Sequence, residues 1–357
     1  MSEDIKTVNV SAERLHELIK KKLVLAGLPE EQAEETTNHL VFADMIGVHS
    51  HGAVRVEYYS ERISKGGINT KPELSFEKTG ASTGIFHGDN AQGHFVANEA
   101  LEPAIEMAKE SGSAVVGVSR VGHTGTLSYY LRKIAEQDLI GIAVTQSDPM
   151  VVPFGGSEVY YGTNPIAFAV PRSNGNPIVF DMATTVQAWG KILDKRSRGE
   201  SIPDTWAVDE TGVPTTDPDA VAGLVPIAGP KGYGLMMMVD ILAGVLLGLP
   251  FGKHVSSMYA DLTEYRNIGH TYIIIDPARF RDIEDFKNDM GQTVDELHDI
   301  KPAPGFDQVF YPGELSSISK EKNEKDGVDI PTTIMDYLES EEVYINSYDG
   351  KGIFADQ

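Results

Sequence analysis

The sequence contains no cysteine among its 357 residues. This absence excludes disulfide bonds, zinc sites built on thiolates and cysteine nucleophiles. Basic residues are also scarce, since 30 Lys and Arg stand against 53 Asp and Glu and give a formal net charge of −23. A protein this acidic is not expected to bind nucleic acid or an anionic membrane surface. Any anionic ligand would need its own local arginine or lysine.

Three other signals are missing. The longest apolar run, residues 235–249, is interrupted by Asp240 and is too short to span a membrane. The opening MSEDIKTVNV lacks the basic-then-apolar layout of a signal peptide, so we expect a cytoplasmic protein. The sequence also contains no GxGxxG, so a standard Rossmann dinucleotide-binding loop is not predicted. The composition, 41% hydrophobic and 23% charged, is typical of a globular protein of about two domains.

A strand–helix–strand unit is predicted in the middle of the chain. Residues 114–119 and 140–145 are short β-branched runs with a helical pattern between them. His123 follows the first run and Asp148 the second. Because ligands in α/β folds bind beyond the ends of strands, these two side chains could form a proton-transfer pair in which the carboxylate orients the imidazole. A loop histidine that caps the next helix is the alternative that spacing leaves open.

The N-terminal part predicts a helical hairpin over residues 11–47, followed by another helix. His51 and Arg55 lie one turn apart at the start of that helix, and Tyr59 follows a turn later. One helix face can therefore carry an imidazole, a guanidinium and a phenol. A guanidinium in this position could bind a substrate carboxylate bidentately, although a solvated arginine paired with a neighbouring glutamate fits the pattern equally well.

A metal site is a remote alternative at the same place. His49, His51 and Asp44 are residues of metal-ligand type and would suit a metal-dependent hydrolase. Two histidines two residues apart have no third ligand at a convincing spacing nearby, so no metal is predicted.

A second candidate for ligand binding is the segment Gly229-Pro230-Lys231-Gly232, which opens the most apolar helix of the chain. Backbone N–H groups at a helix N-terminus, together with a lysine, can hold a phosphate. The spacing is not that of a Walker A loop. Residues 177–180 form another predicted strand, which runs into Asp181-Met182-Ala183, a geometry that serves either cofactor contact or helix capping.

The chain resembles the family of malate/L-lactate-type NAD(P)-dependent 2-hydroxyacid dehydrogenases, which lack the Rossmann fingerprint. The resemblance covers essentially the whole chain, over residues 11–315. The motifs that carry it are His49-Ser50-His51-Gly52 with Arg55, Gly122-His123, Gly162-Thr163-Asn164-Pro165, Asp181-Met182-Ala183, Gly229-Pro230-Lys231-Gly232 and Pro312-Gly313-Glu314.

This resemblance implies an α/β fold with a mixed sheet and flanking helices, a non-Rossmann dinucleotide-binding fold with helical N- and C-terminal parts. It implies one catalytic unit over residues 1–357, divided approximately into a helical substrate part (1–112 with 285–357) and a cofactor-binding α/β part (113–284). A homodimer with the active site near the subunit interface is expected. The implied cofactor is NAD rather than NADP, and the implied substrate is a small 2-hydroxyacid such as malate or L-lactate.

The resemblance also assigns roles to individual residues. His123 is expected to be the acid/base, with Asp148 as its partner. The substrate is expected to contact His51, Arg55, Ser50 and Tyr59. The expected cofactor contacts are Ser147, Asp181, Met182, Ala183, Lys231, Gly313, Glu314 and Leu315.

Overall fold

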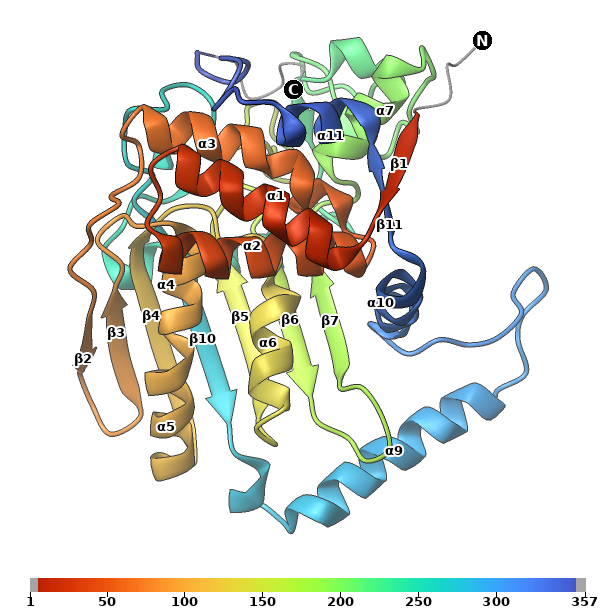
Figure 1. The fold of residues 1–357 in the computed structure, drawn as a ribbon. Coiled ribbons are helices and arrows are strands. Elements are labelled where there is room, and N and C mark those ends of the chain that lie inside the picture. The colour runs from red at the N-terminus through yellow and green to blue at the C-terminus, as the bar shows by residue number, and fades with distance from the viewer. Residues whose placement is uncertain (1–5, 351–357) are drawn as a thin grey trace.

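A computed structural model describes residues 6–350, which form an α/β fold around one seven-stranded mixed sheet (Figure 1). The strand order is β2-β3-β4-β10-β5-β6-β7. β3 and β4 pair in parallel, and every other neighbouring pair is antiparallel. The α/β class with a mixed sheet is thus confirmed. The strands are β2 (Ser75–Lys78), β3 (Thr83–His87), β4 (Ser113–Val121), β5 (Ile140–Thr145), β6 (Ile166–Val170), β7 (Ile178–Met182) and β10 (Ile268–Ile275).

The predicted strand–helix–strand unit is present as β4, α6 (Leu127–Ala135) and β5, but its two strands are not neighbours. β10 lies between them and is antiparallel to both. The two strands are therefore parallel to each other, and their C-terminal ends reach the same end of the sheet. Most side chains of β10 are buried, because helices cover both faces of the sheet at this central strand.

Helices cover both faces of the sheet. α4 (Gly93–Glu99), α5 (Leu101–Ser111) and α6 pack on one face, and their buried side chains share one core with the strands (Figure 1). The sequence 93–112 is divided into two helices just before Pro103, whose missing N–H falls in the first turn of α5. α8 (Pro230–Ala243) covers the opposite face of β5 and β10.

A helical layer with its own core lies across the end of the sheet where β4, β5 and β7 finish (Figure 1). The predicted hairpin is confirmed as its first two helices. The layer consists of α1 (Ala12–Leu25), α2 (Glu30–Met45), α3 (Val56–Ser64) and α11 (Thr332–Glu339), with the two-stranded ribbon of β1 (Thr7–Val10) and β11 (Val328–Pro331) beside them.

The remaining elements lie outside these two layers. Residues 189–228, which we call the excursion, carry only short elements, and several of their side chains belong to a small separate core. α9 runs below the sheet and extends away from the body of the molecule (Figure 1). These elements are α7 (Trp189–Ser197), β8 (Ala207–Val208), β9 (Gly223–Leu224), α9 (Ile283–Asp299), α10 (Glu314–Asp326) and the 3₁₀ turns η3 (Pro218–Ala220), η4 (Val245–Leu247), η5 (Gly252–His254) and η6 (Pro277–Arg279).

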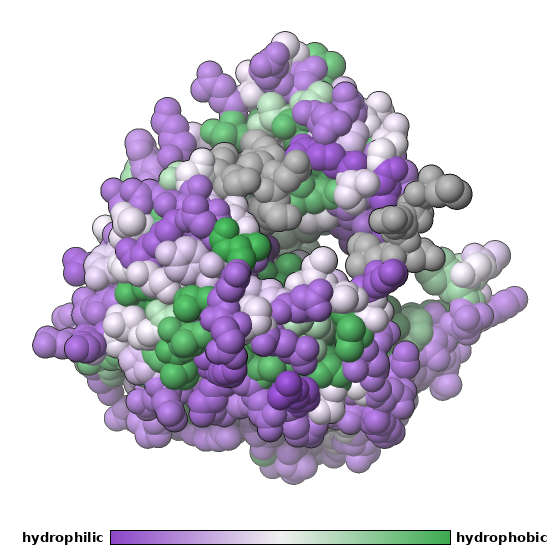
Figure 2. Space-filling model, turned by 45° about the horizontal axis from the view of Figure 1, so that its top comes forward, coloured by the Kyte–Doolittle hydropathy of each residue, from purple (hydrophilic) through white to green (hydrophobic). Residues whose placement is uncertain are grey.

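The division into two parts stays a prediction. β2 and β3 fall in the predicted helical part, yet they belong to the same sheet as β4 to β7. On the face that Figure 2 presents, hydrophilic side chains predominate and apolar groups form smaller separate patches. Within residues 6–350, one segment, Pro230–Leu247, is long and apolar enough to cross a membrane by length and composition alone, and it includes Asp240.

Candidate active site

His123 lies in the loop that leaves the C-terminal end of β4, beneath the helical layer. Its Nδ1 is 2.6 Å from the Oη of Tyr59, which α3 supplies. The ring of His51 stacks on the imidazole with 5.6 Å between centroids. The start of α4 presses against the same loop, because a Cβ on Gly93 would lie 2.3 Å from the His123 carbonyl oxygen. Only glycine permits so close an approach of backbone to backbone.

The surroundings of His123 favour its neutral form. Burial, followed by repulsion from His51, Arg55 and Arg266, holds the pKa of the imidazole well below its ordinary range. Burial, followed by repulsion from Arg55, also lowers the pKa of His51 to about 4. A neutral imidazole at ordinary pH has a lone pair that can accept a proton, which is what a general base requires.

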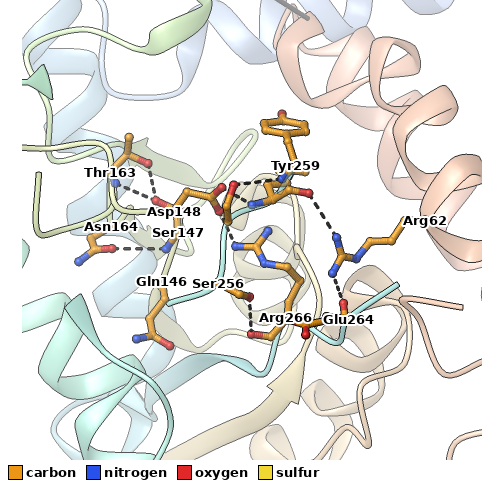
Figure 3. Close-up of polar contacts among 12 residues, drawn as sticks. Arg62, Gln146, Ser147, Asp148, Thr163, Asn164, Ser256, Tyr259, Glu264 and Arg266 are labelled. Atoms are coloured by element: carbon orange, nitrogen blue, oxygen red, sulfur yellow. Dashed lines mark hydrogen bonds and ion pairs between the residues drawn. The ribbon is translucent and has the colours of Figure 1, made fainter. Parts of the chain in front are cut away.

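The predicted pair between His123 and Asp148 is not formed. The contacts of Asp148 are instead with residues 258 and 266, and Figure 3 shows its carboxylate facing Arg266. Its Oδ1 pairs with a guanidinium nitrogen of Arg266, and its Oδ2 accepts a hydrogen bond from the backbone N–H of Met258. The partner that orients His123 is the Tyr59 phenol, which was expected to face the substrate. His123 and Asp148 follow strands that finish at the same end of the sheet, as predicted, but the carboxylate contacts Arg266 and Met258.

Arg266 was missed because residues 256–266 carry no motif. Its guanidinium is buried, and its side chain reaches Asp148 from just before β10, the strand inserted beside β5. The only signal in the sequence was an arginine in a polar stretch immediately ahead of an apolar strand. That signal is weak until β10 is known to lie between β4 and β5.

Arg55 and its neighbours come from two 3₁₀ turns, η1 (His49–His51) and η2 (Ala53–Arg55), rather than from one helix face. The Nε of Arg55 donates to the carbonyl oxygen of Ser50 at 2.7 Å, and its Nη1 donates to the Oη of Tyr259 at 2.7 Å. The hydroxyl of Ser50 lies 3.0 Å from the Nδ1 of His51. The structure therefore brings Ser50, His51 and Arg55 together beside His123, as the sequence predicted.

Two residues of the metal alternative, Asp44 and His49, contact each other, and Asp44 also holds the backbone. One oxygen of Asp44 is 2.9 Å from the Nδ1 of His49, and the other accepts the backbone N–H of Ala53 at 2.7 Å. Across residues 6–350, no group of three His, Asp or Glu side chains is arranged to hold a metal ion. A hydrolase built on these residues thus has no ligand cluster in the described part of the chain.

The site carries local positive charge within a strongly acidic protein. Arg62 on α3 is buried and donates to the backbone carbonyls of Met258 and Glu264, which are neutral groups (Figure 3). Arg62 and Arg266 both interact electrostatically with Asp148, the carboxylate that Arg266 also contacts directly. With Arg55 nearby, guanidinium groups outnumber this carboxylate, so the site suits an anionic ligand despite the net charge of −23.

The expected cofactor residues after β5 and before α8 lie on a connected set of loops. Ser147 Oγ accepts a hydrogen bond from the backbone N–H of Thr163 at 2.7 Å. The backbone carbonyl of Thr163 accepts one from the N–H of Thr184 at 2.8 Å. The carbonyl of Thr184 accepts the N–H of Ile227 at 2.9 Å, just ahead of α8. Ser147, the end of β7 and the start of α8 are thereby held next to each other. Asn164, with φ of 35°, connects the same segments through its side-chain amide. Its Oδ1 accepts the backbone N–H of Ser147, and its Nδ2 donates to the carbonyl of Met236 in α8.

The remaining expected cofactor residues meet at β7. The N–H of Val179 donates to the carbonyl of Pro312 at 3.2 Å, which places Gly313 against the strand. A Cβ on Gly313, where φ is 86°, would lie 2.4 Å from the carbonyl oxygen of Val179, so this position requires glycine. The carboxylate of Glu314 is occupied by His298 at 2.8 Å and by the N–H of Tyr311 at 3.0 Å, whereas Leu315 is exposed.

These residues fit a bound dinucleotide. No side chain caps the N-terminus of α8, where Lys231 is exposed and Gly229 adopts φ of 59°. Thr185, one residue beyond the loop contact at Thr184, has a buried hydroxyl with no hydrogen-bond partner among the described residues. An uncapped helix N-terminus with a free-standing lysine is suited to phosphate, and an unsatisfied buried hydroxyl is suited to a ligand.

Comparison with known proteins identifies the family. The sequence model that describes the malate/L-lactate dehydrogenase family matches residues 10–339 of this chain. The chain belongs to this family. Ureidoglycolate dehydrogenase (NAD(+)) from Escherichia coli K12 is 56% identical over 98% of this chain and 100% of that protein. Malate dehydrogenase from Pyrococcus abyssi is 35% identical over 93% of each chain.

Solved structures of family members have the same fold. Sulfolactate dehydrogenase from Methanocaldococcus jannaschii superposes with a TM-score of 0.86 and 36% identity, covering 93% of this chain and 95% of that one. The non-Rossmann α/β architecture expected from the sequence is therefore the architecture of the family.

Proposed function

We propose that this protein oxidises ureidoglycolate to oxalurate with NAD as the hydride acceptor. The observation that carries the proposal is the 56% identity, over nearly the whole chain, to a ureidoglycolate dehydrogenase (NAD(+)). Malate and sulfolactate dehydrogenases of the family are only 33–37% identical. In this reaction the C2 hydroxyl loses a proton and C2 loses a hydride, which leaves a carbonyl group between the carboxylate and the ureido nitrogen. The reaction belongs to the degradation of allantoin and purines.

His123 is the proposed general base. Its Nδ1 is engaged by Tyr59, so the other ring nitrogen, Nε2, is the atom that takes the hydroxyl proton. Oxidation requires the tautomer in which Nδ1–H donates to the phenolic oxygen, because Nε2 then has a free lone pair. The low pKa of the imidazole keeps the ring neutral at neutral pH, and the contact with Tyr59 is compatible with this tautomer. A base of this kind contributes roughly 10²–10⁴-fold in rate.

Arg55 and Arg266 set the electrostatics of substrate binding. Arg55 is held by Ser50 and Tyr259, and it is the proposed ligand of the substrate carboxylate. Arg266 adds positive potential near His123, while Asp148 fixes its guanidinium and holds residues 256–266 in place. Asp148 thus acts through Arg266, and its proposed role is positioning. His51, stacked on His123, faces the same end of the substrate.

NAD, when bound, accepts the hydride from C2 of the substrate. Lys231 and the N-terminal N–H groups of α8 would hold its phosphates, and Ser147 with residues 181–183 would line the adjoining surface. NAD is preferred to NADP because the relatives at 56% identity are named for NAD(+), whereas an NADP(+)-named relative is only 34% identical.

We also propose that two copies of the chain form a dimer through the face of the sheet covered by α8. Although α8 is the most apolar helix of the chain, one stripe of it faces solvent, and two phenylalanines of β6 and β7 lie exposed on the same side. Apolar side chains exposed together on one face favour an interface. The exposed side chains, which we call the α8 face, are Phe168 of β6, Phe180 of β7, Met238 and Ile241 of α8, and Val245 and Leu246 of η4 just after it.

The alternative within the family is a malate, L-lactate or other 2-hydroxyacid dehydrogenase with the same mechanism. A spectrophotometric assay of ureidoglycolate, malate, L-lactate and sulfolactate, each with NAD and with NADP, decides between them. The proposal predicts the highest kcat/KM for ureidoglycolate with NAD. A higher value for malate or lactate would leave the family intact and overturn the substrate. A higher value with NADP would overturn the cofactor.

A further inference from the structure

The loop that carries His123 is fixed at several backbone positions. The carbonyl of Thr124 accepts the hydroxyl of Tyr130 at 2.6 Å. The carbonyl of Thr126 is 3.1 Å from the Nε2 of His39, a fully buried histidine of α2. Gly125, with φ of 72°, has no room for a Cβ, which would lie 2.1 Å from the His39 ring. A loop held this tightly keeps the imidazole in one place.

A further fixed point comes from a distant strand. Oδ2 of Asp181, in β7, accepts the hydroxyl of Thr126 at 2.7 Å and the backbone N–H of Ser128 at 2.8 Å. Thr126 is the N-cap residue of α6, yet its own side chain makes no capping hydrogen bond. The carboxylate of Asp181 takes that place, where the positive end of the helix and a free N–H favour an anion.

The strand geometry explains how Asp181 reaches this position. Side chains alternate between the two faces of a strand, so Val179 and Asp181 point to the face covered by α6, and Phe180 points to the other. Asp181 is nevertheless exposed at the end of β7, beside Met182 and Ala183. One residue therefore contacts the catalytic loop and also borders the surface where the cofactor is expected.

We propose that Asp181 is a positioning residue that sets the distance between His123 and the hydride acceptor, rather than a ligand of the cofactor through its carboxylate. This inference rests on the proposed function of His123 as the base. Because a base must lie within hydrogen-bond reach of the hydroxyl while C2 faces the acceptor, a shift of about 1 Å in the loop costs on the order of 10²-fold in rate. Asp181 joins the strand on the cofactor side directly to the loop on the base side.

The test is a pair of variants that break the same contact from opposite ends. Asp181→Asn weakens the acceptor, and Thr126→Val removes one donor while keeping the branched shape. We expect each to lower kcat by about 10–100-fold, to change the dissociation constant of NADH by less than about threefold, and to raise the primary isotope effect with C2-deuterated substrate. The double variant should lose little more than either single one, because both remove one interaction. Thr126→Ser, which retains the hydroxyl, should restore most of kcat.

Asp282→Ala is the matched control. Asp282 caps α9 by accepting the N–H groups of Glu284 and Asp285 at 2.9 and 3.1 Å, and α9 lies below the sheet, at the end opposite the one where β4 finishes (Figure 1). This variant should lower the melting temperature and leave kcat and the isotope effect unchanged. If Asp181→Asn instead weakens NADH binding at normal kcat, the carboxylate is a cofactor ligand, and the inference is overturned. If both contact variants only lower the melting temperature, the contact is a helix cap and nothing more.

The failure of the inference is distinguishable from failure of the proposed function. Normal turnover by His123→Ala would overturn the assignment of His123 as the general base, whatever the results with the contact variants. An inactive His123→Ala variant combined with normal kinetics in Thr126→Val and Asp181→Asn would overturn only the positioning role.

Discussion

The residue that orients His123 is a phenol, and this choice affects how the imidazole behaves on protonation. Tyr59 is buried and its Oη lies 2.6 Å from Nδ1, so it accepts the Nδ1–H of the imidazolium without adding a negative charge. A carboxylate in its place would raise the pKa of the histidine. With the phenol, burial and the nearby arginines dominate, and the pKa stays low.

Tyr59→Phe tests this arrangement. The imidazolium loses its Nδ1–H acceptor, so the pKa of His123 should fall further and the acid limb of the kcat/KM profile should move to lower pH. We expect kcat to fall by about tenfold, a fraction of what a general base contributes. Tyr58→Phe, on the same helix, should leave the profile unmoved. An acid limb that stays in place in Tyr59→Phe but moves in Asp148→Asn would restore the carboxylate as the partner of His123.

Arg55→Lys tests carboxylate binding. Arg55 uses Nε for Ser50 and Nη1 for Tyr259, and an ammonium group cannot reproduce such planar, multiple donation. We expect kcat/KM for ureidoglycolate to fall by at least about tenfold while NADH binding is retained. His51→Ala should do milder damage, because it removes one neighbour and no charge at neutral pH. Unchanged kcat/KM in Arg55→Lys would show that the carboxylate binds elsewhere.

At the scale of elements, α8 has two roles. Its N-terminus begins with a glycine at positive φ followed by proline, which fixes the start of the helix and leaves its N–H groups uncapped. Its stem covers the sheet next to β5 and β10. One element therefore connects the proposed phosphate site to the core and to the α8 face.

Lys231→Ala tests the phosphate site. Loss of the ammonium should weaken NADH binding by about tenfold, since charge-assisted contacts to phosphate are among the stronger ones. The KM for ureidoglycolate, measured at saturating NAD, should change little. Lys253→Ala in η5 is the control, since that residue is also an exposed lysine. Equal NADH affinity in the two variants would leave the start of α8 as a helix terminus without a ligand.

Local elements were predictable from the sequence, and contacts between distant elements were not. Caps, glycines and apolar spacing predicted the hairpin α1–α2 and the start of α8. Periodicity carries no information about pairing between segments far apart, so the insertion of β10 between β4 and β5 could not be seen. The same limit explains the site: Ser50, His51 and Arg55 are close in sequence and were grouped correctly, whereas the Arg266–Asp148 pair depends on β10.

At the scale of the whole molecule, the negative charge and the apolar α8 face have different consequences. The net charge of −23 opposes binding of an anionic substrate, and the buried arginines near His123 offset it locally. The α8 face gathers exposed apolar side chains on one side of the sheet, which a second copy of the chain could cover.

Ile241→Asp tests the dimer. Ile241 is 47% exposed at the middle of the stripe, so an aspartate there costs little in the monomer but would be buried without a partner in a dimer. We expect sedimentation velocity to show a dimer for the unmodified protein and a monomer for the variant. Val213→Asp, at an apolar residue 55% exposed on the excursion 189–228, should remain dimeric. A variant Ile241→Asp that stays dimeric would place the interface elsewhere.

The most direct test of the central claim is turnover of ureidoglycolate by His123→Ala, measured on the same sample as its NADH affinity. The imidazole acts on the substrate proton and has no predicted contact with the dinucleotide. We therefore predict that kcat falls by about 10²–10⁴-fold, while NADH titrated by fluorescence binds with nearly unchanged affinity. Turnover close to that of the unmodified protein would contradict the account, because some other group would then be taking the proton.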